Sequence, residues 1–243
     1  MAPPPPSAQD LRLGTPVPGF TPPPRPDGRA MMGRYARLER LQPDAHAAAL
    51  HKAFSVDDSI WDFLPQGPFA SASGLHRWIR QEALGDDPFF FAITNLETGE
   101  TSGFASYLRI APAAGSIEVG YINMAKSLQR TRAATEAIYM MMAWAFESGY
   151  RRFEWKCNAL NMASRRAASR FGFSYEGIFR QATVVKGRNR DTAWFAAIDA
   201  EWPALREAYA TWLDPSNFDA EGQQVERLSD LTRLVRVAED PAQ

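Results

Sequence analysis

The apolar residues of the chain recur at two different spacings, which separate predicted helices from predicted strands. LQRTRAATEAIYMMM and the residues after it place apolar side chains at three- and four-residue intervals, the period of one helix face, and Gly149 ends the pattern. The predicted core positions of this helix are Ile138, Met141, Met142, Ala145 and Phe146. RFEWKC alternates instead, with Phe153, Trp155 and Cys157 on one side, so it predicts a half-exposed strand.

The other elements follow from the same periods and from the turn-forming residues between them. We expect a short strand at 33–41, helices at 44–54, 71–85, 161–173 and 201–213, strands at 89–94, 102–110 and 116–124, and a hairpin with strands at 174–185 and 190–199. Asp44 is a candidate N-cap for the first helix. Turn segments between the three middle strands predict an antiparallel meander. The order of elements indicates one domain of mixed α/β (α+β) class, with one crossover through the central helix.

Both ends of the chain differ in composition from this domain. Prolines crowd residues 1–29 and remove backbone donors, so we expect an extended arm that is either disordered or packed on the domain. The apolar residues that could pack it are Leu11, Leu13, Val17 and Phe20. Residues 215–243 form a tail of mixed charge that could hold a short helix at QQVERLSDLTRLVRV. The chain therefore divides into an arm at 1–29, a domain at 30–214 and a tail at 215–243.

Composition narrows the classes of protein that fit. The 243 residues carry a formal net charge of -1, so affinity for nucleic acid would need a local basic patch. No run approaches the roughly 18 apolar residues that span a bilayer, and MAPPPPSAQD lacks the features of a secretory signal. The single cysteine excludes an internal disulfide framework, and we expect a cytoplasmic protein without membrane attachment. The histidines lack the spacing of zinc ligands, so no metal is expected. The oligomeric state, monomer or homodimer, stays open.

Four segments, in this order, resemble a known enzyme family: IEVGYINM, QRTRAATEA, N-x-x-S-R-R within NMASRRAASRFGF, and WFAAIDAEW. They resemble the GNAT superfamily of N-acetyltransferases, and within it the ribosomal-protein alanine N-acetyltransferase-like branch. The resemblance spans about residues 33–213. It implies a mixed, mostly antiparallel twisted sheet flanked by helices, with acetyl-CoA as the acetyl donor and a primary amine as the acceptor. That acceptor would be a small-molecule amine or a protein N-terminus.

The resemblance also implies where acetyl-CoA would lie. The residues matched to the pantetheine strand are Ile122, Asn123 and Met124. The residues matched to the pyrophosphate loop and helix start are Gln129, Arg130, Thr131, Arg132, Ala133, Ala134 and Thr135. Asn161 and Ser164 match polar cofactor contacts on the next helix. The loop has arginines where the family has glycines, so we predict that Arg130 or Arg132 supplements the backbone N–H groups that hold the phosphates.

Acetyl transfer to an amine needs a base and a donor for the tetrahedral oxyanion. Glu118 is the candidate base if strand alternation directs Val119 and Tyr121 into the core. Otherwise its carboxylate points to solvent or pairs with an arginine. A splayed or bulged strand near Ile122 or Asn123 could supply the oxyanion donor from the backbone.

The departing thiolate also takes up a proton, although coenzyme A is already a moderate leaving group. Many GNAT enzymes use a tyrosine as the acid, but the matching position here is Ala168. Ser164, Tyr175 and Tyr121 are the substitutes, and either tyrosine could instead be a packed aromatic residue. Cys157 could suggest an acetyl-enzyme intermediate, but it lies on the apolar side of its strand, which favours a buried structural thiol.

Two segments could form the walls of an acceptor cleft. KGRNRD occupies a hairpin turn, where Asp191 could attract an amine. DDSIWDFLPQGPF supplies Trp61, Asp62 and Phe63, and aromatic rings beside carboxylates suit a cationic acceptor. The alternative for the second segment is a loop held in place by buried aromatic residues.

Two other functions remain open on sequence alone. A non-catalytic acyl-CoA-binding or interaction module would explain Ala168 and the missing glycines. An RNA-binding protein would use Arg165, Arg166 and Arg170, although a solvated helix face explains these arginines as well. The leading hypothesis is an acetyl-CoA-dependent N-acetyltransferase that works by direct amine attack in a ternary complex.

Overall fold

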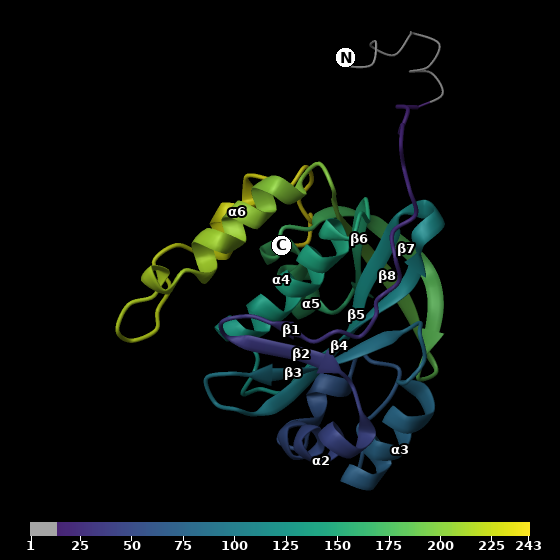
Figure 1. The fold of residues 1–243 in the computed structure, drawn as a ribbon. Helices are drawn as coiled ribbons and strands as arrows, with labels where there is room; N and C mark the ends of the chain where they lie inside the picture. The colour runs from purple at the N-terminus through teal and green to yellow at the C-terminus, as the bar shows by residue number, and fades with distance from the viewer. Residues whose placement is uncertain (1–13) are drawn as a thin grey trace.

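The computed structural model describes residues 14–243 and contains one sheet of eight strands (Figure 1). The strands lie in the order β1-β2-β3-β4-β5-β6-β8-β7, and all neighbours are antiparallel except β5 and β6. Their bounds are β1 Met31–Met32, β2 Ala36–Arg40, β3 Phe89–Asn95, β4 Thr101–Ala111, β5 Ser116–Met124, β6 Arg152–Asn158, β7 Ser174–Val185 and β8 Arg188–Ile198. The predicted single α/β domain and its β3-β4-β5 meander are confirmed.

Helices cover both faces of the sheet and bury two hydrophobic clusters. They are α2 Pro43–Phe54, α3 Ala72–Glu82, α4 Arg132–Glu147, α5 Met162–Arg170, α6 Trp202–Leu213 and α7 Leu228–Arg233, with short turns η1 Asp58–Trp61, η2 Pro112–Ala114 and η3 Pro215–Asn217. Helices α2 and α3 lie together at the bottom of Figure 1 and bury Phe90 and Phe104 of the sheet. Helices α4 to α7 contribute to the larger cluster, together with Val119, Trp155 and Phe195.

The central helix α4 buries the face that its spacing predicts. All five predicted core positions, from Ile138 to Phe146, are at most 8% exposed. The helix begins at Arg132, after a turn whose last residue, Thr131, accepts a hydrogen bond from the Ala134 N–H. This N-cap bond satisfies one of the free N–H groups of the first helical turn.

Strand β6 is less exposed than its alternation predicts. Its apolar side is buried as expected, but the side chains of Lys156 and Glu154 on the polar side are only 6% and 13% exposed. The prediction of a half-exposed strand is therefore wrong in degree. The physical reason is that neighbouring strands supply ionic and aromatic partners for these side chains, including Glu118 and Trp194.

The N-terminal part of the domain differs in detail from the prediction. Helix α2 begins at Pro43, with Gln42 in the N-cap position, so Asp44 lies inside the first turn and is not the cap. Proline suits that first position because its missing N–H would have no partner inside the helix. The predicted strand at 33–41 is shorter, and the two-residue strand β1 precedes it. A carboxylate from α4, Glu136, accepts hydrogen bonds from three backbone N–H groups of this turn.

Strands β5 and β6 pair over only part of their lengths. Their parallel ladder runs from Ser116–Arg152 to Val119–Trp155, although both strands continue beyond it. Just past this point two residues of β5, Tyr121 and Ile122, lie opposite one residue of β4. Tyr121 has a φ of 48°, which a non-glycine residue rarely adopts. We call the place where the two strands part the β5–β6 fork.

The described part of the proline arm lies against the domain. A Cβ on Gly115 would come within 3.0 Å of the Phe20 ring, and Tyr150 donates a hydrogen bond to the Pro24 carbonyl at 3.0 Å. Val17 is 46% exposed. Leu11 and Leu13, the other residues proposed to pack the arm, lie outside the described residues.

The C-terminal tail also packs on the domain. Its short helix is confirmed as α7, and Leu228 is fully buried in the larger cluster. Farther on, the Asp240 carboxylate forms a buried ion pair with Arg165 of α5. The tail therefore shares the core of the domain.

Candidate active site

Glu118 of β5 lies at the base of the β5–β6 fork and is only 2% exposed. Both of its carboxylate oxygens lie 2.8 Å from Arg109 Nη1, and Lys156 Nζ lies 2.9 Å from Oε2. Burial raises the pKa of Glu118, although the charges of Lys156 and Arg109 oppose that shift. The carboxylate is thus held in place by two cations while its affinity for a proton is increased.

The strand alternation that was expected around Glu118 is broken by the bulge. Val119 points into the larger cluster as predicted, but Tyr121 packs on the opposite side, with its ring 5.3 Å from that of Phe90. The prediction that Tyr121 joins Val119 is wrong because the extra residue shifts the side-chain alternation by one. Glu118 and Tyr121 therefore lie on the same side of the sheet.

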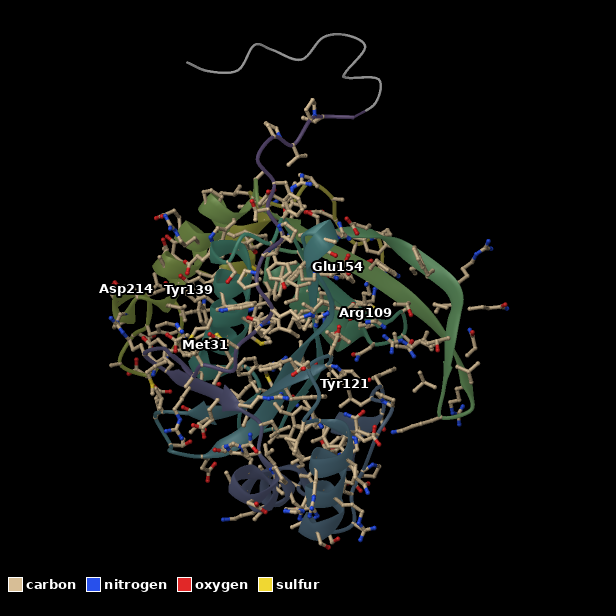
Figure 2. All side chains as sticks on the ribbon, turned by 45° about the vertical axis from the view of Figure 1, so that its right-hand side comes forward. Met31, Arg109, Tyr121, Tyr139, Glu154 and Asp214 are labelled. Atoms are coloured by element: carbon tan, nitrogen blue, oxygen red, sulfur yellow. The ribbon has the colours of Figure 1, made fainter. Side chains whose placement is uncertain are left out.

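The ion pairs of Glu118 continue across the polar face of the sheet. Lys156 also contacts Glu154 at 2.6 Å, and Arg152 donates to Glu154 at 2.7 Å and to Glu176 of β7 at 2.7 Å. Figure 2 shows Glu154, Arg109 and Tyr121 one below the other, with the β7–β8 hairpin arching to their right. The tip of this hairpin reaches η1, because Lys186 Nζ donates to the Trp61 carbonyl at 2.9 Å. The hairpin and η1 thus flank the polar face.

The start of α4 offers free backbone donors beside the fork. Within residues 14–243, no hydrogen bond uses the N–H groups of Arg132 and Ala133. The Arg132 side chain is committed elsewhere: it pairs with Glu97 and lies 4.9 Å from the Phe218 ring centroid. Arg130 is exposed and has a φ of 63°. Of the two arginines predicted to grip a phosphate, Arg132 is engaged in these contacts, whereas the Arg130 side chain is exposed.

The other residues matched to the cofactor are distributed between the surface and the interior. Gln129 donates to the Met124 carbonyl at 2.9 Å, which ties the loop to the end of β5. Ile122 packs on the larger cluster. Thr135 is buried, and its hydroxyl accepts from Arg170 at 3.1 Å, so its side chain is structural. The Ala133 and Ala134 side chains are buried too.

Asn123 stands out among these residues. It is 2% exposed, yet neither its amide nitrogen nor its amide oxygen has a hydrogen-bond partner in the described part of the chain. A buried amide normally finds partners, because leaving it unpaired is costly. At the end of β5, the Asn123 amide therefore lacks the donor and acceptor partners that a buried amide needs.

Helix α5 brings two predicted residues to the other side of the fork. Asn161 caps the helix by accepting from the Ser164 N–H at 3.0 Å. Trp155, the last β6 residue paired with β5, donates its indole N–H to Ser164 Oγ at 3.0 Å. Burial raises the pKa of Cys157 to about 11, which agrees with a structural thiol rather than a nucleophile.

Tyr175 is not brought to this site. It lies on β7, three strand spacings or about 14 Å from β5. Its ring packs 5.4 Å from that of Phe195, and its N–H donates to the Ala238 carbonyl. Among the arginines proposed for RNA, Arg165 pairs with Asp240 and only Arg166 is exposed.

The predicted acceptor residues also separate. Trp61 is 2% exposed and packs among Phe54, Phe69 and Phe104, so its ring is an anchor rather than a substrate contact. Asp62 and Phe63 beside it are exposed. The Asp191 carboxylate accepts from the Gln181 N–H at 2.7 Å and from Asn189 at 3.0 Å, and these bonds lower the pKa of Asp191. It therefore stabilises the hairpin.

Comparison with known proteins shows the family of this chain. The family model described as "Acetyltransferase (GNAT) domain" matches residues 36–174, which is more than half of the chain. The chain belongs to the GNAT acetyltransferase family. A GCN5-related N-acetyltransferase from Brucella melitensis is 44% identical, with a TM-score of 0.87, and the match covers 89% of this chain and 100% of that one.

More distant GNAT structures show how far the likeness extends. A probable acetyltransferase of the GNAT family from Chromobacterium violaceum ATCC 12472 is 38% identical over 84% of this chain and 100% of that chain, with a TM-score of 0.74. A ribosomal-protein-S5-alanine acetyltransferase from Vibrio fischeri shares the fold, with a TM-score of 0.56 at 15% identity over 72% of this chain and 98% of that chain. A search of curated proteins finds no match.

The sequence alone did not indicate several residues that lie around Glu118. Arg109, Lys156, Arg190 and Trp194 surround or face Glu118 from three other strands. Their residue types alone did not indicate a role, because the register between the strands decides which side chains lie next to Glu118. Residues 14–243 contain no group of three or more side chains suited to a metal ion, and none of their helices has the length and apolar character to span a bilayer.

Proposed function

We propose that this GNAT protein transfers the acetyl group of acetyl-CoA to a primary amine by direct attack within a ternary complex. The observation that carries the proposal is the β5–β6 fork, which has a buried carboxylate at its base and free helix N–H groups beside it. The acceptor class in the broad sense, a small-molecule amine or a protein N-terminus, is part of the same proposal. So is a cytoplasmic location, which cell fractionation would test.

The fork suits the extended pantetheine of acetyl-CoA. Beyond Val119 the backbone of β5 has no β6 partner, so its edge is available to the amides of pantetheine. The pyrophosphate would then lie at the start of α4, where the N–H groups of Arg132 and Ala133 and the positive end of the helix favour an anion. Arg130 would add a charge at the surface of this site.

The proposed acetyl transfer uses residues from both sides of the β5–β6 fork. The amine nitrogen attacks the thioester carbon, the C–S bond breaks, and the proton from the amine passes to the Glu118 carboxylate. The raised pKa of Glu118 favours this transfer. A backbone N–H at the Tyr121–Ile122 bulge would stabilise the oxyanion. Ser164 would relay a proton from solvent to the departing thiolate, giving up its own proton as it takes the replacement; its oxygen accepts the Trp155 indole N–H, and its hydroxyl also hydrogen-bonds Cys157.

Tyr175 has no part in this mechanism because of its distance from the fork. The proposed substrate contacts likewise omit the Trp61 ring and the Asp191 carboxylate, whose packing and hydrogen bonds engage them elsewhere. Asp62 and Phe63 stay as proposed contacts at the rim, because both are exposed.

The experiment mixes purified protein with acetyl-CoA and a panel of amines and follows the release of free thiol. We expect turnover on at least one amine. Glu118→Gln should lower kcat by roughly 10²- to 10⁴-fold and remove the base-dependent limb of the pH–rate profile. Glu154→Gln is the matched control, since Glu154 also contacts Lys156 but lies on β6 opposite Glu118 and pairs with Arg152; its loss should be much smaller. An unchanged rate and pH profile in Glu118→Gln would make Glu118 structural.

One alternative is supported by a specific observation. Ala168 is fully buried where the usual acid would be, as expected of a non-catalytic acyl-CoA-binding module. Thermal stabilisation by acetyl-CoA, without thiol release on any amine, would favour this module over the enzyme.

A further inference from the structure

The polar face beside Glu118 has more cations than it can pair. Arg109, Arg152 and Lys156 each contact at least one carboxylate there. Arg190 of β8 is different, because no hydrogen bond or ion pair joins its side chain to another residue of the described chain. Burial lowers the pKa of Arg190, and the charges of Cys157, Arg109, Glu118 and Tyr121 also act on it. Arg190 thus lies within electrostatic range of the candidate base and lacks a partner.

A second unpaired donor lies on the same face of the same strand. Arg190 and Trp194 are four residues apart on β8, so their side chains project to one side. That side is the one facing Glu118, since Lys156 Nζ lies 3.7 Å from the Trp194 ring centroid. Arg190 Nε and Trp194 Nε1 are both buried atoms without an acceptor among residues 14–243.

The chemistry of Arg190 and Trp194 determines which kind of hydrogen-bond partner each side chain lacks. A guanidinium and an indole N–H can only donate hydrogen bonds, so neither can satisfy the other. A partner for either group must therefore supply acceptor atoms, and the positive charge of Arg190 favours an anion. A carboxylate and a phosphate share this chemistry.

The β7–β8 hairpin, which contains Arg190 and Trp194, carries further positive charges. Arg180, Lys186 and Arg188 add positive charge between the two strands, and the Asp191 carboxylate is already hydrogen-bonded. Phe179 of β7 packs with its ring 4.4 Å from that of Trp194. The open groove of about 740 Å³ along the hairpin is lined by Phe179, Arg180, Gln181, Ala182, Asn189 and Asp191, and not by Arg190 or Trp194.

We infer that the acceptor amine carries an anionic group, which Arg190 and the Trp194 N–H bind while the amine faces Glu118. This inference rests on the proposed acetyl transfer and names the class of its acceptor. It adds an anionic group to the amine acceptor expected from Asp62 and Asp191, since Arg190 and Trp194 present hydrogen-bond donors beside Glu118. The role of Arg190 and Trp194 is to bind and orient the acceptor.

The test uses pairs of amines that differ only in the anion: phenylalanine with phenylalaninamide, and phosphoethanolamine with ethanolamine. Wild-type protein should favour the charged member of at least one pair in kcat/KM, and the pair identifies carboxylate or phosphate. Arg190→Gln should raise KM for that member about 10- to 100-fold, and this rise should far exceed any change for its neutral counterpart. Trp194→Phe should raise the same KM by about 3- to 10-fold.

Arg188→Gln is the matched control, because it removes the same charge from an exposed position on the same strand. It should leave the preference intact, and Arg190→Lys should keep part of it. Preference for the neutral member of both pairs, or an equal loss on both members in Arg190→Gln, would overturn the inference.

A second readout separates this inference from the proposed function. Thermal shifts of the protein with each charged amine, without acetyl-CoA, report binding in the absence of chemistry. Stabilisation that disappears in Arg190→Gln supports the anion site even if no amine is acetylated, a result that would count against the transferase alone. If neither turnover nor an Arg190-dependent shift is seen with any charged amine, the anion site is refuted.

Discussion

The substitution Lys156→Met tests the ion-pair network that holds the candidate base. Lys156 Nζ lies 2.9 Å from Glu118 and 2.6 Å from Glu154, and the three side chains are 6%, 3% and 13% exposed. Methionine keeps most of the side-chain volume, so the change removes the charge with little loss of packing. Glu118 and Glu154 then both lose the cation that they share.

The magnitude follows from the contacts that remain. Removing one partner of a buried ion pair costs about 3–5 kcal/mol. Glu118 keeps Arg109 at 2.8 Å and Glu154 keeps Arg152 at 2.7 Å, which places the expected loss near the lower limit. We expect a loss of about 3 kcal/mol in the free energy of unfolding at pH 8. For a chain of this size that corresponds to about 6–12 °C in Tm.

The pH dependence gives the sharper test. Burial raises the pKa of Glu118, so its contribution to stability is present at low pH and is lost as pH rises through the folded pKa. Burial alone would raise the pKa of Glu154, but the hydrogen bonds from Arg152 and Lys156 outweigh burial and lower it. The contribution of Glu154 to stability is therefore present above its unfolded pKa and is lost as pH falls through the folded pKa. Without Lys156 both carboxyls bind protons more readily. The loss in the variant should therefore shrink as pH falls.

Urea unfolding followed by tryptophan fluorescence at about pH 8 and pH 5 measures this difference between wild type and variant. Lys126→Met is the matched control, since Lys126 pairs with Asp57 at 3.0 Å but is 54% exposed, and its effect should be much smaller. A loss below about 1 kcal/mol at pH 8, or one of equal size at pH 5, would refute the reasoning, because the network would then be screened like a surface pair.

Three further predictions follow from other parts of the structure. Arg130→Ala should raise the Kd for acetyl-CoA several-fold by calorimetry, whereas Arg132→Ala should mainly lower Tm; an unchanged Kd in Arg130→Ala would leave the phosphate site to the backbone. Arg165→Met should cost about 3–5 kcal/mol in urea unfolding, because it leaves Asp240 buried and unpaired. Burial alone would raise the pKa of Asp240, but the hydrogen bonds from Arg165 outweigh burial and lower it. The loss of stability in Arg165→Met should therefore shrink below about pH 4, and a loss that stays constant with pH would contradict the buried ion pair. Gly33→Ala should lower the free energy of unfolding by about 1–3 kcal/mol, because its Cβ would clash with the buried Glu136 carboxylate. Unchanged stability would show that this turn can shift.

Local patterns predicted most of the fold correctly. The face of α4 that contains Met141 and Met142 and the buried side of β6 were readable because helices and strands have fixed periods. The meander and hairpin were readable from turn residues between apolar runs. Errors occurred where a single residue decided the outcome, as with Pro43 at the start of α2.

The candidate site was only partly readable. Glu118 was identified because the GNAT resemblance places it just before the cofactor strand, and the bulge was anticipated near Ile122. The side to which Tyr121 points was wrong, since a one-residue bulge reverses alternation and leaves no mark in the sequence. The burial of Trp61 was left open, because an aromatic residue beside acids fits either a cleft or an anchor.

By itself the sequence determined the elements, their order and the family, because these depend on periodicity and on motifs within single segments. Only the tertiary structure decided which charges meet. The pairing of β5 with β4 and β6 brings Arg109 and Lys156 to Glu118, and β8 adds Arg190 and Trp194 on the same face. Such contacts depend on register between strands that are distant in the chain, and register is set by the packing of the whole sheet.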